Sequence, residues 1–435
     1  MVESEMLKGK KLLIVGGLST LSDLVELAHR NGVFVGVADY NKNTFLKKIA
    51  DAQHEISATD VKAIVQLVKE EHYDGIISQF NDMLLPFLAD EAEELGLWVP
   101  FSAEQARMST DKIYFKKKCV EYGLPVPMEY EIKSRDDIFN AVIDFPVIIK
   151  PVDSGGSRGI SVCTDRQELL NGYDVAVSAS KSGRVIVEQY LPYDEVNLTF
   201  IVQDGVAQLA AIHDRYFNTK QKAFKVPDLY IYPSRYTDLI LQKYSKNIIA
   251  MLEGIGIKNG SLFIQAIVKD ENLYLYEAGM RLNGCKTYHI LDVENDYNTF
   301  EHLMNYALTG SMGQFTELNA KFKRWYATWC VVTMPEKKIG GFRGEEELAS
   351  YPWFIYNDKR YHEGESIPTS LVGTLGQLSS RIHLYGNTKE RSSDLLIEHI
   401  KKVFETYDVV DENGESMLLP KHDVDEIRRR LDYSL

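Results

Sequence analysis

The feature that most constrains the fold is a regular alternation of short apolar strands and helical patterns at the start of the chain. Apolar runs at 11–15, 33–38 and 75–78 are separated by helical patterns, the clearest of them at 61–71. Strands that alternate with helices at this spacing indicate a parallel sheet in a doubly wound domain. We therefore predict an N-terminal α/β domain over residues 1–104.

The length and charge of the chain limit what else it contains. At 435 residues the chain is too long for one core, and we expect about three domains. The formal net charge of -14 argues against nucleic acid or an anionic membrane as the main partner. No apolar run approaches the ~18 residues of a membrane span, and the first ten residues lack a signal-peptide pattern.

The four cysteines, at 119, 163, 285 and 330, are scattered and form no CxxC pair. This spacing argues against a structural zinc site or a disulfide framework and favours reduced thiols. We therefore expect a cytoplasmic protein.

The remainder divides by secondary-structure pattern. Strand-like runs at 147–149, 160–162, 185–187 and 198–201 follow a lysine-rich helix and indicate a central α+β domain over 105–312. We expect a C-terminal β-rich domain over 313–410, closed by a helix at 392–406, and a helical appendage over 411–435.

Two strand ends in the N-terminal domain carry polar residues. Gly16 and Gly17, followed by Asp39, resemble part of a dinucleotide-binding motif. The sequence lacks the full GxGxxG pattern, so an NAD-dependent oxidoreductase is disfavoured. Asp39 is then a strand-end polar residue or a substrate contact. Residues 79–82 also follow a strand end, where open α/β sheets bind ligands, or they only cap a helix.

A glycine-rich loop follows a lysine at the end of an apolar strand. Lys150 precedes the loop, which contains Gly155, Gly156, Ser157 and Gly159. Glycines allow backbone N–H groups to close over phosphate oxygens, and a lysine adds a point charge. A lone loop of this kind is more often a solvated hairpin, and Lys150 is what favours phosphate binding.

A hairpin further along brings metal-type and phosphate-type side chains together. Two apolar runs, 261–268 and 273–276, flank a turn at 269–272, so Gln265, Glu277 and Arg281 come within reach of one point. Two oxygen ligands and a guanidinium suit a divalent cation and a phosphate, respectively. Alone, a carboxylate and an arginine at the end of a strand are more often a surface ion pair.

The order of these motifs over about residues 10–400 resembles the ATP-grasp superfamily of ligases. The resemblance implies a two-lobed ATP-grasp domain at the centre of the chain. It also implies ATP-binding roles for residues in four groups: the phosphate lysines Lys112 and Lys150; the lid residues Gly155, Gly156, Ser157 and Gly159; the adenine contacts Glu188, Gln189 and Leu191; and the ribose contact Glu195.

The same resemblance implies the catalytic residues. Gln265 and Glu277 match the two metal positions, for Mg²⁺ or Mn²⁺, and Arg281 matches the arginine that steadies the transferred phosphate. Lys150, Glu277 and Arg281 would carry catalysis. The chain departs from the family pattern at Gln265, usually an acid, and at Gly279, often an asparagine.

The implied activity is ATP-dependent ligation of a carboxylate to an amine through an acyl phosphate, with small-molecule substrates and a possible homodimer. Alternatives are a purine-type or carbamoyl-phosphate-type enzyme acting on formate or bicarbonate, and a catalytically impaired nucleotide-binding protein. His213, Arg215 and His289 are further substrate-contact candidates, although Arg215 is at least as readily a structural ion pair.

Overall fold

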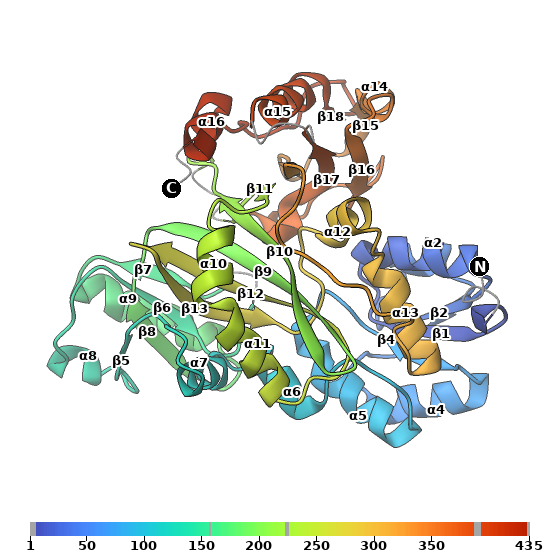
Figure 1. Ribbon diagram of the computed structural model, residues 1–435, viewed down its shortest axis with the longest axis horizontal. Helices are drawn as coiled ribbons and strands as arrows, with labels where there is room; N and C mark the ends of the chain where they lie inside the picture. The colour runs from blue at the N-terminus through green and yellow to red at the C-terminus, as the bar shows by residue number, and fades with distance from the viewer. Residues whose placement is uncertain (1–5, 156–157, 222–225, 387–392, 433–435) are drawn as a thin grey trace.

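The computed structural model describes residues 6–155, 158–221, 226–386 and 393–432 (Figure 1). Within these ranges the chain is mixed α/β, with a parallel N-terminal sheet and a large antiparallel sheet, which confirms the predicted fold class. No helix in the described ranges is both long and apolar enough to cross a membrane. All four cysteines are buried and unpaired.

The N-terminal sheet is parallel, in the order β3-β2-β1-β4. Its strands are β1 (Lys11–Val15), β2 (Phe34–Ala38), β3 (Ala52–His54) and β4 (Gly75–Ile77). The sequence analysis missed β3, which is short and carries no fully buried residue. Its sequence, Ala-Gln-His, contains no apolar run from which a strand could be predicted.

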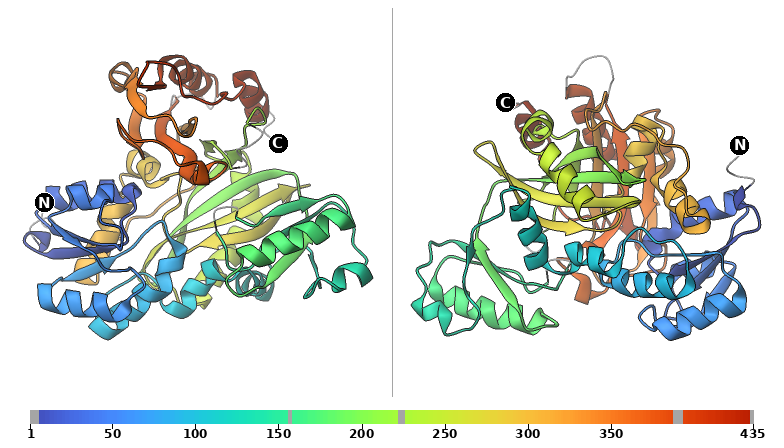
Figure 2. Two further views of the ribbon diagram at one scale, coloured as in Figure 1. Left: turned by 180° about the vertical axis from the view of Figure 1, so that it is seen from behind. Right: turned by 60° about the horizontal axis from the view of Figure 1, so that its bottom comes forward.

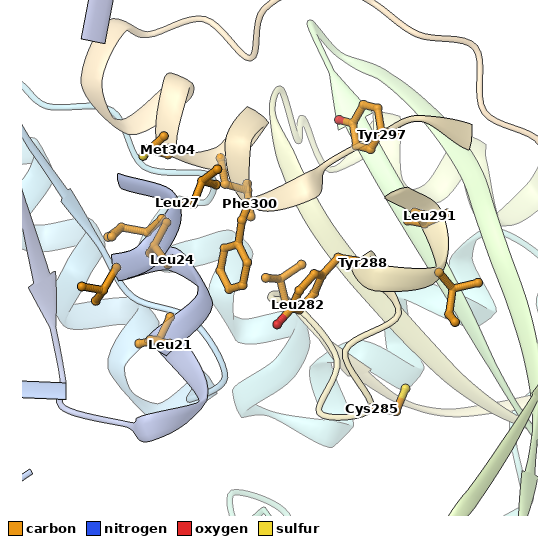
Figure 3. Packing of buried hydrophobic residues seen from close by; sticks show 14 of the residues in the cluster. Leu21, Leu24, Leu27, Leu282, Cys285, Tyr288, Leu291, Tyr297, Phe300 and Met304 are labelled. Carbon is orange, nitrogen blue, oxygen red and sulfur yellow. The ribbon is translucent and has the colours of Figure 1, made fainter. Parts of the chain in front are cut away.

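Helices cover both faces of this sheet, and one of them comes from much later in the chain. Leu13 and Val15 of β1 pack toward α4 (Val61–Glu71) and α5 (Leu85–Leu95). Leu12 and Ile14 pack toward α2 (Ser22–Arg30) and α13 (Thr299–Thr309). Figure 3 shows this second core, in which leucines of α2 face Phe300.

The smaller central lobe is a four-stranded antiparallel sheet in the order β5-β8-β6-β7. The strands are β5 (Glu129–Tyr130), β6 (Val147–Pro151), β7 (Ser161–Cys163) and β8 (Val185–Gln189). Helices α8 (Asp137–Asn140) and α9 (Arg166–Ala179) contribute Ile138, Leu169 and Ala176 to its core.

The large sheet has the order β13-β12-β9-β10-β11-β14-β17-β16. Its strands are β9 (Asp194–Gln203), β10 (Val206–Tyr216), β11 (Leu229–Tyr232), β12 (Gly260–Lys269), β13 (Asn272–Gly279), β14 (Tyr326–Val332), β16 (Phe354–Lys359) and β17 (Leu378–Tyr385). Because β11 pairs with β14, the C-terminal strands continue the sheet of the central region.

Four helices flank the central strands, as Figure 2 shows from two further directions. They are α6 (Ala103–Thr110), α7 (Lys112–Glu121), α10 (Thr237–Lys243) and α11 (Ser245–Gly254). Short helix α12 (Tyr288–Asn295) lies beside α13.

The C-terminal region adds a two-stranded sheet and three helices. These elements are β15 (Ile339–Arg343), α14 (Glu345–Ala349), α15 (Asp394–Thr406), β18 (Asp408–Asp411) and α16 (Val424–Asp432). Ile427 and Leu431 anchor α16 in the C-terminal core, so the final described helix is packed against the protein.

Candidate active site

The hairpin predicted around residues 261–281 is present and carries a β-bulge inside the candidate site. Lys269 pairs with Asn272 across the turn, and Gln265 pairs directly with Glu277. Residues opposite one another in an antiparallel pair lie close enough to share a ligand. The register then shifts, and Tyr276 becomes the extra residue of a bulge.

This bulge brings the Tyr276 hydroxyl into the site. The hydroxyl donates to Gln265 Oε1 at 2.9 Å and lies 2.8 Å from Glu195 Oε2. The sequence analysis missed Tyr276, because strict strand alternation places it on the opposite face from its neighbour Glu277.

Arg215, on β10, links the same group of side chains. Its Nη1 donates to Glu195 Oε2 at 2.6 Å and to Gln265 Oε1 at 3.0 Å, and it also contacts Tyr276. Burial opposes the arginine charge, but Tyr276 and Glu195 outweigh burial and raise the pKa of Arg215. Of the two alternatives left open for Arg215, the structure contains the ion pair, formed with Glu195.

Lys112 lies at the first position of α7, which Asp111 caps. Its Nζ donates to the Ser154 backbone oxygen at 2.9 Å and lies 3.5 Å from Glu277 Oε1. The lysine is only 7% exposed. Lys112 thus connects the start of the glycine loop to the carboxylate of the hairpin.

Lys150 and Glu188 form a buried ion pair between neighbouring strands of the small lobe. Lys150 Nζ is 2.5 Å from Glu188 Oε2, and Lys116 Nζ is 2.7 Å from Glu188 Oε1. Burial raises the pKa of Glu188, but the two lysine charges outweigh burial and lower the pKa below its ordinary value. Both carboxylate oxygens are therefore engaged by lysines, and the adenine contact stays a prediction.

Lys116 was missed in the sequence analysis although a signal was present. It lies four residues after Lys112 on α7, so both side chains project from one face of the helix. Its Nζ also lies 3.2 Å from Glu129 Oε2.

The glycine loop is described in part. Gly156 and Ser157 lie outside the described residues. At Gly159, φ is +75°, and an added Cβ would lie 2.5 Å from Ala179 Cβ, so this position requires glycine. The Gly155 position has open space around it.

The remaining predicted nucleotide contacts, Gln189 and Leu191, lie at the end of β8 and just after it. The Gln189 backbone N–H donates to Met128 O at 2.9 Å, and Leu191 is buried. Their predicted backbone contacts with adenine remain predictions.

Arg281 follows β13 and reaches back to the N-terminal domain. Its Nε and Nη2 each lie 2.7 Å from Asp82 Oδ2. The neighbouring Leu282 N–H donates to Gln79 Oε1 at 2.9 Å. Of the two roles left open for residues 79–82, the structure contains the helix cap, made by Asn81 on a short 3₁₀ helix, and ligand binding stays a prediction. Gln79 and Asp82 hold the loop that follows β13.

The other strand-end residue, Asp39, has a structural contact. Its Oδ2 accepts a hydrogen bond from the Gly17 N–H at 2.7 Å. Asp39 thus fixes the glycine turn after β1.

The histidine candidates have different surroundings. His213 is fully buried, lies 3.7 Å from Cys285 Sγ, and has its pKa held well below the ordinary value by burial. His289 Nε2 lies 3.1 Å from Asp23 Oδ2. Within the described ranges, neither histidine forms a hydrogen bond with Glu277 or Arg281.

The hairpin has donors of the type that Mg²⁺ prefers. Gln265 and Glu277 supply an amide oxygen and a carboxylate from paired positions. Mg²⁺ characteristically takes one or two protein oxygens and completes its shell with substrate phosphates and water. The described residues contain no group of three or more His, Cys, Asp or Glu side chains arranged for a metal. The donor set therefore fits a metal shared with a nucleotide, and it lacks the ligands of an all-protein cage.

A comparison with known protein families identifies the central region of the chain. Residues 143–289 match the family model for the ATP-grasp domain. The chain therefore contains an ATP-grasp domain, as the sequence resemblance predicted.

Two curated relatives carry the same enzyme name. The chain is 26% identical over 194 residues to the formate-dependent phosphoribosylglycinamide formyltransferase of Bacillus subtilis, covering 43% of this chain and 50% of that protein. It is 28% identical over 262 residues to the enzyme of the same name from Tolumonas auensis, covering 58% of this chain and 64% of that protein. The match thus spans about half to two thirds of these relatives.

Solved structures share the fold over most of the chain. An L-amino acid ligase from Bacillus licheniformis superposes with a TM-score of 0.75 at 18% identity, covering 93% of this chain and 99% of that chain. A phosphoribosylglycinamide synthetase from Anaerococcus prevotii superposes with a TM-score of 0.70 at 16% identity, covering 92% of this chain and 99% of that chain.

Proposed function

We propose that this protein is an ATP-dependent carboxylate–amine ligase that forms an amide through an acyl phosphate and releases ADP and phosphate. The observation that carries the proposal is a series of contacts between the two lobes. Lys150 pairs with Glu188 and lies over the Tyr276 ring, 5.4 Å from its centroid. From Tyr276 the series continues through Gln265 to its strand partner Glu277, and from there to Lys112. Cations and oxygen ligands arranged along one surface match the needs of phosphoryl transfer.

The positive side chains would bind and orient the ATP phosphates. Lys112 and Lys150 come from different lobes, so a nucleotide held by both is fixed between them. Arg281 would stabilise the charge that develops on the transferred phosphoryl group, while Asp82 holds its guanidinium in place. Gly155 and Gly159 belong to a loop that would exclude water from the acyl phosphate.

Gln265 and Glu277 would hold the divalent cation, Mg²⁺ or Mn²⁺, which neutralises phosphate charge when bound. Gln265 contributes no negative charge, and Arg215 donates to its oxygen. Cation binding would therefore depend strongly on the nucleotide phosphates.

A second candidate is a ligase of the same mechanism that activates formate. The curated relatives named as formate-dependent formyltransferases favour this candidate. The two candidates differ in the carboxylate that is activated, and one assay separates them.

The test is ADP release by the purified chain with ATP and Mg²⁺, first with single L-amino acids and pairs of them, then with formate or bicarbonate and amine acceptors. The ligase proposal expects ADP only when a carboxylate is present, with one amide formed per ADP. Tight ATP binding without turnover across both panels would overturn it.

Glu277→Ala should lower the rate of ADP formation at least about a hundredfold, since loss of one transition-state charge stabiliser costs roughly this much. The matched control is Glu271→Ala, because Glu271 lies in the turn of the same hairpin and is exposed. Near-wild-type turnover in Glu277→Ala would contradict the metal assignment.

A further inference from the structure

A cavity of about 310 Å³ lies away from the proposed nucleotide site, where α2, α12, the start of α13 and β16 meet. This volume is at the lower end of the roughly 300–1,000 Å³ of small-molecule sites. None of the residues assigned to ATP or metal binding lines the cavity.

Two helices face one another across this cavity. From α2 it is lined by Asp23, Glu26, Leu27 and Arg30, which lie on one helical face. Figure 3 shows the neighbouring leucines of this helix packed toward Phe300, with Tyr288 close by. The inner edge of the cavity is therefore continuous with a rigid core.

The opposite wall is aromatic and partly acidic. It includes Tyr288, His289 and Asp292 from α12, and Tyr356 from β16. The His289 ring packs against the Tyr356 ring with centroids 4.6 Å apart. Aromatic rings that are packed against each other form a preorganised wall for a small ligand.

Charges of both signs line the rim. Glu26, Arg30 and Asp292 are exposed, and their side chains form no hydrogen bond or ion pair within the described residues. Glu26 and Arg30 lie one helical turn apart yet form no ion pair with each other. A ligand with one negative and one positive group is therefore complementary to this rim.

The base of the cavity connects the N-terminal domain to segments of the central and C-terminal regions. Asp23 Oδ2 accepts hydrogen bonds from the Tyr288 hydroxyl at 2.6 Å and from Lys286 Nζ at 3.1 Å. The fully buried Lys286 also lies 2.7 Å from Asp358 Oδ1, and Asp358 binds Arg381. Burial opposes ionisation of Asp23, but His289 and Lys286 outweigh it and hold the pKa of Asp23 well below its ordinary range.

We propose that this cavity is a second ligand site, separate from the catalytic site, that binds a small zwitterion of the free amino acid class. The carboxylate of the ligand pairs with Arg30, and its ammonium group pairs with Glu26 and Asp292. Its side chain packs against Tyr356 and His289. Because the base of the cavity joins the N-terminal, central and C-terminal regions, an occupied site stabilises their arrangement.

The test is calorimetric titration of the full chain, without nucleotide, with each of the twenty L-amino acids. At least one amino acid should bind saturably, and its N-acetyl and amide derivatives should each bind at least tenfold more weakly. Arg30→Gln and Glu26→Gln should each weaken binding at least tenfold. Both positions are exposed, so the variants should fold.

Matched controls are Lys62→Gln and Glu93→Gln, which make the same charge changes on exposed positions of α4 and α5. Glu277→Ala should bind the amino acid as tightly as the wild type does. The binding test therefore gives a clear result even if the ligase proposal is wrong. Absence of binding by every amino acid up to millimolar concentration, or unchanged affinity in Arg30→Gln, would overturn the proposal. Arg30→Gln could also raise the KM for an amino acid that the enzyme consumes, by the same factor by which it weakens the binding of that amino acid. That result would make the cavity a subsite of the catalytic site and would overturn the proposal of a separate site.

Discussion

Asp82 and Arg281 lie 199 residues apart in the chain and form an ion pair in which Nε and Nη2 both lie 2.7 Å from one carboxylate oxygen. The pair joins the loop after β4 to the loop after β13. The N-terminal domain thereby fixes the direction of the guanidinium proposed to act on the transferred phosphate.

Asp82→Asn should lower kcat for ADP formation about tenfold while ATP affinity stays nearly constant, because the loss of a charge-assisted hydrogen bond costs about 1.5 kcal/mol or more. Stopped-flow or steady-state kinetics with a separate nucleotide titration measures both. Asp238→Asn is the matched control, since Asp238 forms only an exposed ion pair with Lys321. An equal fall in both variants would show that Asp82 has no particular role.

Lys116→Met should destabilise the protein by up to about 3 kcal/mol, because it removes one of two cations from the buried Glu188 carboxylate. The pKa of Glu188 is lowered in the folded state, so its contribution to stability is present above the unfolded pKa and is lost as pH falls. The variant should therefore unfold in acid at a higher pH than the wild type.

Acid titration followed by circular dichroism tests this shift. Lys118→Met is the control, because Lys118 is on the same helix and pairs with Glu121 at the surface. If Lys116→Met and the wild type unfold at the same acid pH midpoint, Lys116 does not stabilise the ionised Glu188.

Gln265→Glu should lower the Mg²⁺ concentration needed for half-maximal ADP formation several-fold, because it adds a carboxylate directly opposite Glu277. Metal titrations at fixed ATP measure the change, and Gln53→Glu on the exposed strand β3 is the control. Unchanged metal dependence would remove Gln265 from the proposed metal site.

Glu91→Gln should make stability less dependent on pH between about 5 and 8. Glu91 is fully buried on α5, and burial, with a smaller contribution from Asp90, raises its pKa from 4.5 to about 8. The folded state thus retains a proton that the unfolded state releases between these values, and wild-type stability falls as pH rises through this range.

Thermal unfolding at pH 5.5 and 8.5 measures this effect. The variant should gain Tm relative to the wild type at pH 8.5 and much less at pH 5.5, with Glu93→Gln as the exposed control on the same helix. A constant difference between the wild type and Glu91→Gln at both pH values would show that Glu91 does not titrate in this range.

The local parts of the candidate site were predictable from the sequence. The hairpin around Gln265 and Glu277 was predictable, because two apolar runs flank a short turn. The direct pairing of Gln265 with Glu277 depends on the bulge, since the register that pairs Lys269 with Asn272 would otherwise place Gln265 opposite Tyr276. The placement of Tyr276 was not predictable in this way, because a bulge interrupts the alternation on which such reasoning depends.

The chain by itself determined the alternating N-terminal elements, the glycine loop after a strand lysine, and the hairpin with its two oxygen ligands. Each is encoded within a few residues by periodicity or turn chemistry. The tertiary structure decided that Lys116 reaches Glu188, that Asp82 holds Arg281, and that α13 covers the N-terminal sheet. These contacts join distant segments, and only the packing of whole helices and sheets determines which side chains meet.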